Sequence, residues 1–420
     1  MSASAAIPLE AEDCAILDLE CATVAGHTCK VVILAAPAPA VEEIRVLIGS
    51  RIGSAPVLTA VLSGEGDERV LVQDREFDVR RHVGSQSDTE VPEADLPGCV
   101  TSLFEERLPR DRPLWRIDLV KLEGGRAALV WRLHHAIADG TAAIRLAEAL
   151  LWDREDSDSD SRRPSRAASP HTDDERRRAH LGAFIRREFG ESWHHSPFDG
   201  EIGTRRLVAF AQVPLRSLHD AAKAICGASV NDAVLAVVAG GLRDWLVDRH
   251  GDLGSLRMRV PVSLHSEGDD AANRDSFFTL PVSLSEADPV TRLHEIHRRT
   301  AARKREHDAE QLEQLTATLA KASPHLAQLA QRIEATPRSF ALAVSNVPGP
   351  RRAVSVLGSP VESMHSLAEI GMNHALRVAV VSVSGELCFG LIADPAIVDD
   401  LDVMGRGIEA HAAALASAAL

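Results

Sequence analysis

The chain has 420 residues, 45% of them hydrophobic and 25% charged, an ordinary composition for a globular protein with room for two or three domains. Its formal net charge of −15 argues against nucleic acid and anionic lipid surfaces as general partners, because both attract basic proteins. Aromatic residues make up only 4% and Tyr is absent, so stacking on bases is also disfavoured and the core must consist mainly of Val, Leu, Ile and Ala.

The cysteine pattern and the N-terminal sequence predict a reducing, cytoplasmic location. Six cysteines are scattered along the chain without a C-x-x-C pair, and the first residues contain neither a basic stretch nor a long apolar run. The longest apolar segments, such as 233–239, are too short to cross a bilayer. Any contact with a membrane or a lipid droplet is therefore expected to be peripheral.

The first 152 residues alternate between strand-like and helix-like segments. Predicted strands cover residues 29–34, 69–73, 113–120 and 127–133, and predicted helices cover 41–62, 99–108 and 141–152. A Glu-Gly-Gly turn separates the last two strands, which predicts a β-hairpin. Trp115 lies in the first strand of this hairpin, where it either packs in the core or lines a substrate channel.

A charged segment then separates two parts of the chain. Residues 153–180 combine many Asp, Arg and Ser residues with few apolar ones, which is the composition of a solvated linker. We therefore place an N-terminal half at residues 1–152, a linker and crossover at 153–204, and a C-terminal half at 205–420.

The C-terminal half shows the same alternation. Predicted strands cover residues 205–213, 256–263, 276–284, 340–345, 374–384 and 386–393, and predicted helices cover 214–226, 229–246, 289–335 and 401–420. Strands that alternate with helices in both halves predict the α/β class, arranged as two α/β sandwich domains.

Residues 131–140 contain the strongest candidate for a catalytic group. An apolar strand delivers the adjacent His134 and His135 into a turn with Asp139 and Gly140, and a helix follows. A histidine at the end of a strand is well placed to act as a general base in a cleft. Because side chains alternate along a strand, the two rings are expected to point to opposite faces, and His134 is expected only to pack and form hydrogen bonds. The pair is a poor metal site without a third ligand, so we expect no bound metal.

The string His-His-x-x-x-Asp-Gly in this segment is also the signature of the acyl-CoA-dependent acyltransferase superfamily, which includes chloramphenicol acetyltransferase and peptide-synthetase condensation domains. Five further motifs occur in the order found in bacterial wax ester synthase/diacylglycerol acyltransferases: Pro-Leu-Trp at 113–115, Ser-Val-Asn-Asp-Ala at 229–233, Val-Pro-Val-Ser at 260–263, Asn-Arg at 273–274 and Ser-Asn-Val-Pro-Gly-Pro at 345–350. Over residues 75–395 the chain therefore resembles that family.

The resemblance implies two chloramphenicol-acetyltransferase-like domains with the active site at their interface. It further implies transfer of a fatty acyl group from acyl-CoA to a long-chain alcohol or a diacylglycerol, with His135 as the general base and without a covalent acyl-enzyme. No cofactor is expected to be bound, since acyl-CoA is a co-substrate. The implied partners are acyl-CoA and a hydroxyl-bearing lipid, while the CoA-binding residues and the oligomeric state stay open.

Other residues of the matching motifs receive roles from the same resemblance. Asp139 would fix its loop through a salt bridge, for which Arg274 is the expected partner, and Gly140 would let substrate or backbone approach closely. Asn231 would either donate to the developing oxyanion or cap its helix. Asn346 would lie in a rigid turn beside the domain interface, where it and Arg274 are candidates for substrate binding.

The same string occurs a second time, at 194–200. There it follows a charged segment, contains Pro197 and runs into a loop, so we assign the base to His135 and not to His195. Two other functions remain compatible with the sequence. One is an acyltransferase of the same fold that acts on a hydroxyl of a polyketide or another specialised metabolite, and the other is a catalytically silent module that binds acyl-carrier proteins.

Overall fold

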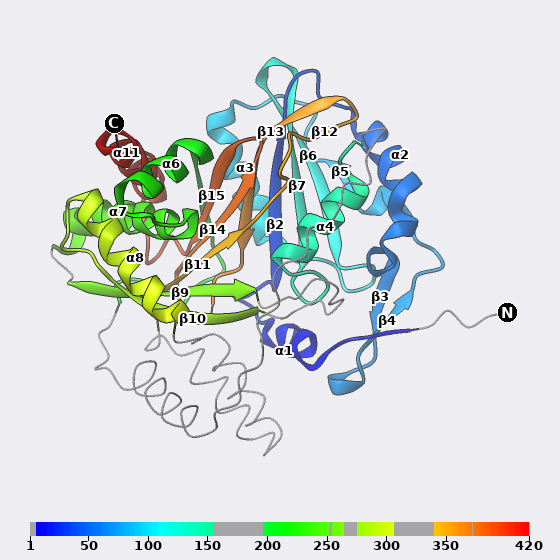
Figure 1. Ribbon diagram of the computed structural model, residues 1–420. Helices are drawn as coiled ribbons and strands as arrows, with labels where there is room; N and C mark the ends of the chain where they lie inside the picture. Colours follow the sequence, from blue (N-terminus) through cyan, green and yellow to red (C-terminus); the bar gives the residue numbers. More distant parts are fainter. Residues whose placement is uncertain are drawn as a thin grey trace.

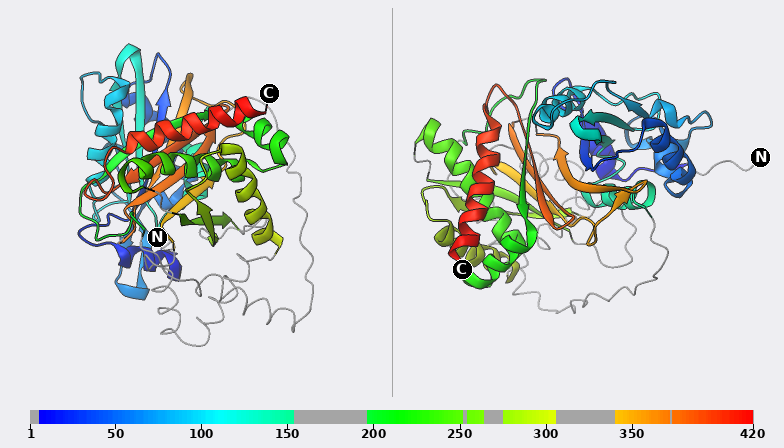
Figure 2. Two further views of the ribbon diagram at one scale, coloured as in Figure 1. Left: turned by 90° about the vertical axis from the view of Figure 1, so that its left-hand side faces the viewer. Right: turned by 90° about the horizontal axis from the view of Figure 1, so that it is seen from above.

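Two six-stranded β-sheets form the framework of the protein (Figure 1). The computed structural model describes residues 6–153, 196–251, 254–263, 275–305, 340–371 and 373–419. The predicted α/β class is confirmed, because helices pack on both sheets and the two halves lie side by side (Figure 2).

The first sheet has the strand order β12-β13-β2-β7-β6-β5. Its strands are β2 (His27–Leu34), β5 (Val83–Ser85), β6 (Trp115–Leu122), β7 (Arg126–His134), β12 (Ser355–Val356) and β13 (Ser359–Ala368). β6 and β7 form the predicted hairpin, in which Trp115 lies opposite Leu133 and the turn Glu123–Gly125 joins the strands. This hairpin places the two adjacent histidines at the end of a central strand.

β12 and β13 come from the C-terminal half of the chain and yet belong to the first sheet. β13 pairs antiparallel with β2, so that Leu367 lies opposite Cys29. The sequence predicted no strand in this region, because buried polar residues interrupt the apolar pattern; they are Ser363, His365 and Ser366. A shared sheet therefore ties the two halves together.

Helices cover both faces of the first sheet. They are α1 (Ala11–Leu19), α2 (Val41–Arg51), α3 (Leu96–Glu105) and α4 (Gly140–Leu150), and a small sheet contains β1 (Ile7–Pro8), β3 (Ala60–Ser63) and β4 (Val70–Gln73). Because side chains alternate along β2, Val31 packs in the cluster that contains α3, whereas Val32 packs with α2 and α4. The helix predicted over 41–62 ends at Arg51, and short 3₁₀ turns and β3 take the place of its second part, since Pro56 cannot continue an α-helix.

The second sheet has the strand order β10-β9-β11-β14-β15-β8. Its strands are β8 (Leu207–Pro214), β9 (Ser255–Ser263), β10 (Asp275–Ser283), β11 (Leu342–Val347), β14 (Leu376–Val383) and β15 (Glu386–Ala393). The helices of this half are α6 (Leu215–Cys226), α7 (Val230–His250), α8 (Pro289–Arg305) and α11 (Leu401–Ala418). They lie on the side of the sheet that faces away from the first half (Figure 2), and α7 is buried along most of its length.

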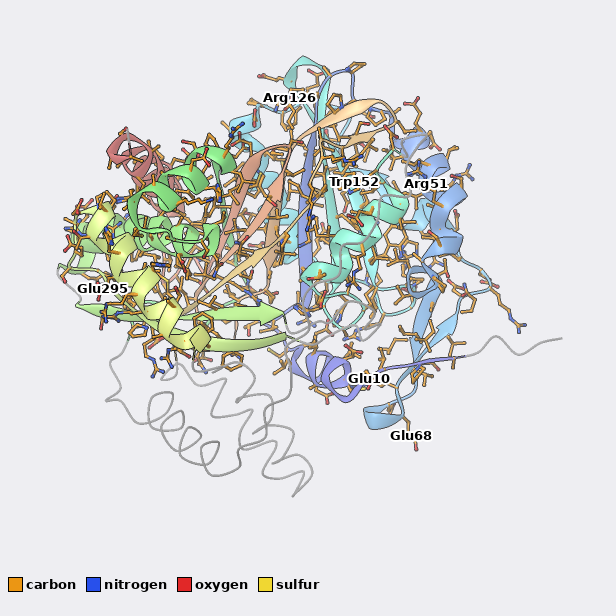
Figure 3. All side chains as sticks on the ribbon, viewed as in Figure 1. Glu10, Arg51, Glu68, Arg126, Trp152 and Glu295 are labelled. Atoms are coloured by element: carbon orange, nitrogen blue, oxygen red, sulfur yellow. The ribbon has the colours of Figure 1, made fainter. Side chains whose placement is uncertain are left out.

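Side chains fill the interior of both halves (Figure 3). Polar contacts also join neighbouring elements near the surface. Arg51, at the end of α2, donates to the carbonyl of Trp152 at 2.7 Å and so holds the chain that follows α4. Arg126, at the start of β7, pairs with Glu93 and with Glu362, and therefore joins the hairpin to β13. Within the described residues no single helix is long and apolar enough to cross a membrane; α6 and α7 meet that test only together, across a bend of 99°.

Candidate active site at the end of strand β7

The two adjacent histidines have different environments. The His134 ring is fully buried: its Nε2 lies 3.2 Å from Glu20 Oε1, and its Nδ1 accepts a hydrogen bond from the N–H of Ala136 at 3.1 Å. Both of its nitrogens are engaged, as expected for a structural residue. His135 is partly exposed and its Nδ1 is buried, so the edge that carries Nε2 is the one that can meet a ligand. Within the described ranges no three His, Cys, Asp or Glu side chains are grouped to hold a metal ion.

The segment before β2 holds the backbone of both histidines. The N–H of His135 donates to the carbonyl of Gly26 at 2.9 Å. Gly26 has a φ of +72°, and a Cβ there would lie 2.7 Å from His134 Nε2, so only glycine fits at this position. Burial raises the pKa of Glu20, but hydrogen bonds from His134 and Arg110 outweigh it and hold that pKa at about 2. No pattern in the sequence predicted that this segment supports the site.

The surroundings keep the His135 imidazole neutral. Burial lowers the pKa of His135 from its ordinary 6.5 to about 4, and the positive charges of Arg377 and Lys30 add to the shift. Lys30 is itself buried and donates to Ser366 Oγ at 2.5 Å; burial lowers its pKa to about 8, while Asp139 opposes that change. A neutral imidazole can accept a proton at physiological pH. Neither Arg377 nor Lys30 was predicted to lie near the base, although a lysine within an apolar strand was a signal for Lys30.

Asp139 forms the N-terminal cap of α4. Its Oδ1 accepts the N–H of Ala142 at 2.6 Å, and the carboxylate is buried, which fits the architectural role expected for it. Arg274, the expected partner of a salt bridge, lies outside the described residues, so that ion pair stays a prediction. Gly140 approaches the second half closely, because a Cβ there would lie 3.0 Å from Val347 Cγ2.

Val347, the residue that Gly140 approaches, belongs to one of the two asparagine motifs of the second half. Asn346 lies at the end of β11, next to the residue that contacts Gly140, and its Nδ2 donates to Asn231 Oδ1 at 3.4 Å. Ser229 caps α7 by accepting the N–H of Asp232 at 3.3 Å, so the capping role considered for Asn231 belongs to Ser229. The two asparagines therefore contact each other, and Asn346 directly precedes the residue that Gly140 approaches.

Asp232 anchors the start of α7 to α8. It accepts hydrogen bonds from His297 Nδ1 at 2.9 Å and from Thr300 Oγ1 at 2.6 Å. Burial raises the pKa of Asp232, but the hydrogen bonds from these two residues outweigh it and keep the pKa below its ordinary value. The carboxylate is therefore a fixed structural anion, and it immobilises the helix turn that carries Asn231.

Trp115 is 1% exposed and offers almost no surface to a substrate. Its Nε1 donates to the carbonyl of Leu58 at 2.7 Å, and its ring stacks on His82 at a centroid distance of 4.6 Å. These contacts correspond to core packing, one of the two roles considered for this residue.

The second occurrence of the histidine motif has a different context. His194 and His195 lie outside the described residues, but the turn that follows them is described. Asp199 Oδ2 accepts the N–H of Ser196 at 2.8 Å, and Phe198 is fully buried against the second half. This segment is a turn rather than a strand that leads into a helix, which supports His135 as the base.

Replacing Asp139 with Ala is expected to act through structure. The variant loses the capping hydrogen bond of α4, worth about 1 kcal/mol, so its melting temperature should fall together with its turnover. Asp139→Asn keeps a capping oxygen and should lie between Asp139→Ala and the parent. Thermal melts and initial rates on the same samples test this. An Asp139→Ala variant with the parent's melting temperature and structure but no turnover would instead give Asp139 a chemical role.

Because several histidines are buried, we expect acid to destabilise the folded state at a higher pH than the one at which His135 becomes protonated. Burial lowers the pKa of His27 to about 3 and those of His135, His365 and His374 to about 4, from an ordinary 6.5. Below pH 6.5 the unfolded chain therefore binds more protons than the folded one, and stability is lost as the pH falls from 6.5 toward 4. The denaturation midpoint should drop between about pH 7 and 5, while turnover of folded enzyme stays flat down to about pH 5.5. An acid limb of turnover centred at the ordinary histidine pKa would contradict this.

Two family models match the chain. The wax ester synthase/diacylglycerol acyltransferase catalytic domain matches residues 9–191, and the C-terminal domain of the same family matches residues 271–415. One probable diacylglycerol O-acyltransferase of Mycobacterium tuberculosis is 30% identical over 332 residues, which are 71% of this chain and 72% of the relative. A second one is 29% identical over 374 residues, which are 80% of this chain and 79% of the relative.

A solved structure extends the comparison to the fold. The wax ester synthase/diacylglycerol acyltransferase from Marinobacter aquaeolei VT8 superposes with a TM-score of 0.73 at 22% identity, over 98% of this chain and 99% of that one. At this identity the likeness concerns the fold, and it confirms the expected two-domain α/β arrangement. With both family models in sequence order and relatives that span most of their length, the chain belongs to the wax ester synthase/diacylglycerol acyltransferase family and is an acyltransferase.

Proposed function

We propose that the protein transfers a fatty acyl group from acyl-CoA to the hydroxyl of a long-chain alcohol or a diacylglycerol, with His135 as the general base. The observation that carries the proposal is the His135 ring itself. It follows β7 directly, its pKa is lowered to about 4, and its Nδ1 is buried, so that the Nε2 edge faces outward. Membership of the family supports acyl transfer. The family's name supports both acceptors, and the names of the mycobacterial relatives support diacylglycerol.

In this reaction His135 Nε2 takes the proton of the acceptor hydroxyl while the alcohol oxygen attacks the thioester carbonyl. The C–S bond then breaks, and the imidazolium gives the same proton to the departing CoA sulfur. The products are the ester and free CoA, and the imidazole returns to its neutral form. The charges of Arg377 and Lys30 favour this return, because they destabilise the imidazolium.

We assign stabilisation of the oxyanion to Asn231. Its Oδ1 accepts from Asn346, so the amide N–H is the group that it can offer to the thioester oxygen. It lies in the first turn of α7, where the helix dipole also favours negative charge. Asp232 fixes that turn against α8, so the amide is held in place before the substrate arrives.

A panel of acceptors tests the proposal. Palmitoyl-CoA would be offered with hexadecanol, with dipalmitoylglycerol, and with short or polyketide-like alcohols, and both CoA release and ester formation would be measured. We expect rapid esterification of the long-chain acceptors. Turnover restricted to the polyketide-like hydroxyls would move the acceptor to specialised metabolism, and no turnover with any acceptor would favour a silent binding module.

We further infer that a cytoplasmic enzyme of this kind meets its acceptors at the surface of a membrane or a lipid droplet, since both acceptors partition into lipid. The net charge of −15 opposes binding through anionic lipid. Cosedimentation with vesicles should therefore rise with diacylglycerol content and not with anionic lipid content. A dependence on anionic lipid alone would contradict this inference.

A further inference from the structure

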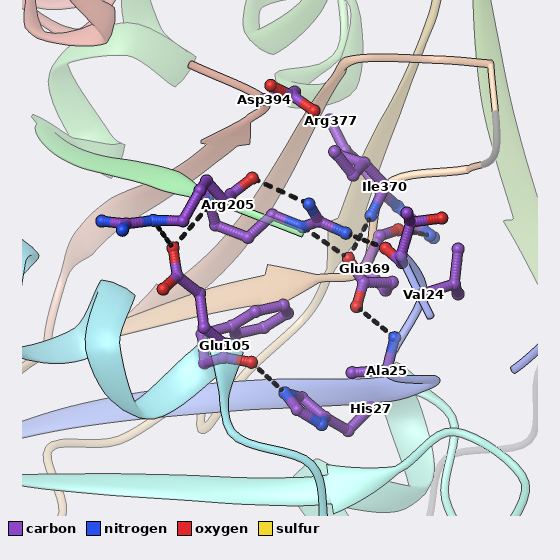
Figure 4. A network of polar contacts seen from close by, with 12 residues as sticks. Val24, Ala25, His27, Glu105, Arg205, Glu369, Ile370, Arg377 and Asp394 are labelled. Atoms are coloured by element: carbon purple, nitrogen blue, oxygen red, sulfur yellow. Dashed lines mark hydrogen bonds and ion pairs between the residues drawn. The ribbon is translucent and has the colours of Figure 1, made fainter. Parts of the chain in front are cut away.

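A buried ion pair joins several segments close to His135. Arg206, immediately before β8, places its Nε 2.9 Å from Oε1 of Glu369, which follows β13, and the two side chains are 3% and 10% exposed. The Arg206 guanidinium also donates to the carbonyl of Gly203 at 2.8 Å and to the carbonyl of Thr23. Figure 4 shows the network, in which Glu369 lies between the N-terminal segment and the arginines. The pair therefore connects the chain entering the second half with the segment before β2.

This ion pair fixes the backbone that supports the proposed base. Glu369 Oε2 accepts the N–H of Ala25 at 2.9 Å. The next residue, Gly26, accepts the N–H of His135 at 2.9 Å. A continuous path of contacts thus runs from Arg206 through Glu369 to the backbone of His135. The two hydrogen bonds therefore tie the backbone position of His135 to the position of the Glu369 side chain.

Glu369 also fixes a positive charge beside the imidazole. Its main-chain carbonyl accepts a hydrogen bond from Arg377 Nη1 at 3.0 Å. Arg377 is the cation that acts most strongly on the imidazole of the proposed base. Among the described residues, His134 on β7 and Lys30 on β2 also act on that ring, and Lys30 in turn interacts with Asp139 at the start of α4.

We propose that Arg206 and Glu369 are positioning residues for acyl transfer, which set the place of His135 and of the Arg377 guanidinium without contacting substrate. The proposal rests on the role of His135 as base. A buried ion pair is costly to desolvate and adds little net stability. Its contacts to Thr23, to Ala25 and to Arg377 at the start of β14 all lead toward the site, so the pair is suited to positioning groups of the site as well as to holding the fold.

Glu369→Gln tests the proposal, because it keeps the shape of the side chain and removes its charge. We expect kcat to fall about 10²-fold, the effect of a displacement of about 1 Å, while KM for both substrates stays within about twofold. Because a displaced ring is less completely buried, the pKa of His135 should also rise from about 4 toward the ordinary histidine value. Arg206→Lys, which keeps the charge but loses the fork of donors, gives the same test if Glu369→Gln does not fold.

Glu362→Gln is the matched control. It removes an exposed partner of Arg126 at the opposite end of β7, so it breaks another ion pair made from β13, far from the histidines. This variant should keep the parent's kcat and pH profile. An equal loss of kcat in Glu362→Gln and Glu369→Gln would overturn the proposal, as would a folded Glu369→Gln variant with the parent's kcat.

Chemical labelling separates this proposal from the role of the base. Diethylpyrocarbonate reacts with neutral imidazole, so the pH dependence of labelling at His135, read from fragment ions that separate it from His134, reports the pKa of that ring whether or not it is catalytic. We expect this pKa to rise in Glu369→Gln and to stay unchanged in Glu362→Gln. An unchanged His135 pKa in Glu369→Gln would overturn the positioning role. A rise in Glu369→Gln together with an active His135→Ala enzyme would uphold the positioning of the ring and refute its role as base.

Discussion

Replacing His135 with Ala is expected to lower the turnover of palmitoyl-CoA with hexadecanol by roughly 10²–10⁴, the usual contribution of a general base. The variant loses the group that accepts the hydroxyl proton. The backbone hydrogen bond to Gly26 stays in place and the lost ring is partly exposed, so the melting temperature should change little. Initial-rate CoA release and thermal melts on the purified protein measure both effects.

Two other histidines serve as controls for this experiment. His195→Ala alters the second occurrence of the motif and should leave turnover within a few-fold of the parent. His134→Ala removes a buried ring that is hydrogen-bonded to Glu20 and Ala136, so it should act mainly by destabilising the fold, by about 1–3 kcal/mol. If a folded His195→Ala were the inactive variant, the active site would not be at the end of β7.

Gly390→Ala is expected to cause a large loss of stability. Gly390 lies on β15, and a Cβ there would lie 2.1 Å from the backbone oxygen of Ser366 on β13. The two sheets meet at this point, and a backbone atom cannot rotate away as a flexible side chain would. We expect a loss of about 3 kcal/mol or more, at the upper end of overpacking, and a correspondingly lower midpoint of chemical denaturation.

Gly98→Ala is the matched control for this prediction. Gly98 is an exposed residue of α3, and a Cβ there would meet no atom within 4 Å. Alanine is the better helix former, so this variant should gain about 0.5–1 kcal/mol. A Gly390→Ala protein with the parent's stability would mean that the sheets do not approach as closely at β13 and β15 as the geometry indicates.

Properties that depend on near neighbours in the chain were predictable from the sequence. Strand alternation predicted different environments for His134 and His135, and the structure confirms this, with one ring buried and doubly hydrogen-bonded and the other partly exposed. The β6–β7 hairpin and the helix that begins at Gly140 are confirmed for the same reason, because the turn residues and the apolar periodicity that specify them lie within about ten residues.

The neighbourhood of the base depended on contacts that local patterns do not contain. Lys30 and Ser366 are 336 residues apart and lie on neighbouring strands of one sheet. No periodicity within β13 indicates that it pairs with β2, since its alternation is interrupted by buried polar residues.

The sequence by itself therefore determined the α/β class, the order of the family motifs and the residue proposed as the base. Only the tertiary structure decided that a strand of the second half completes the first sheet, that Lys30 is buried near Asp139, and that Glu369 connects Arg206 to the segment before β2. The physical reason is that a charge can be buried only where distant segments supply its partners, and a local pattern does not say which segments those are.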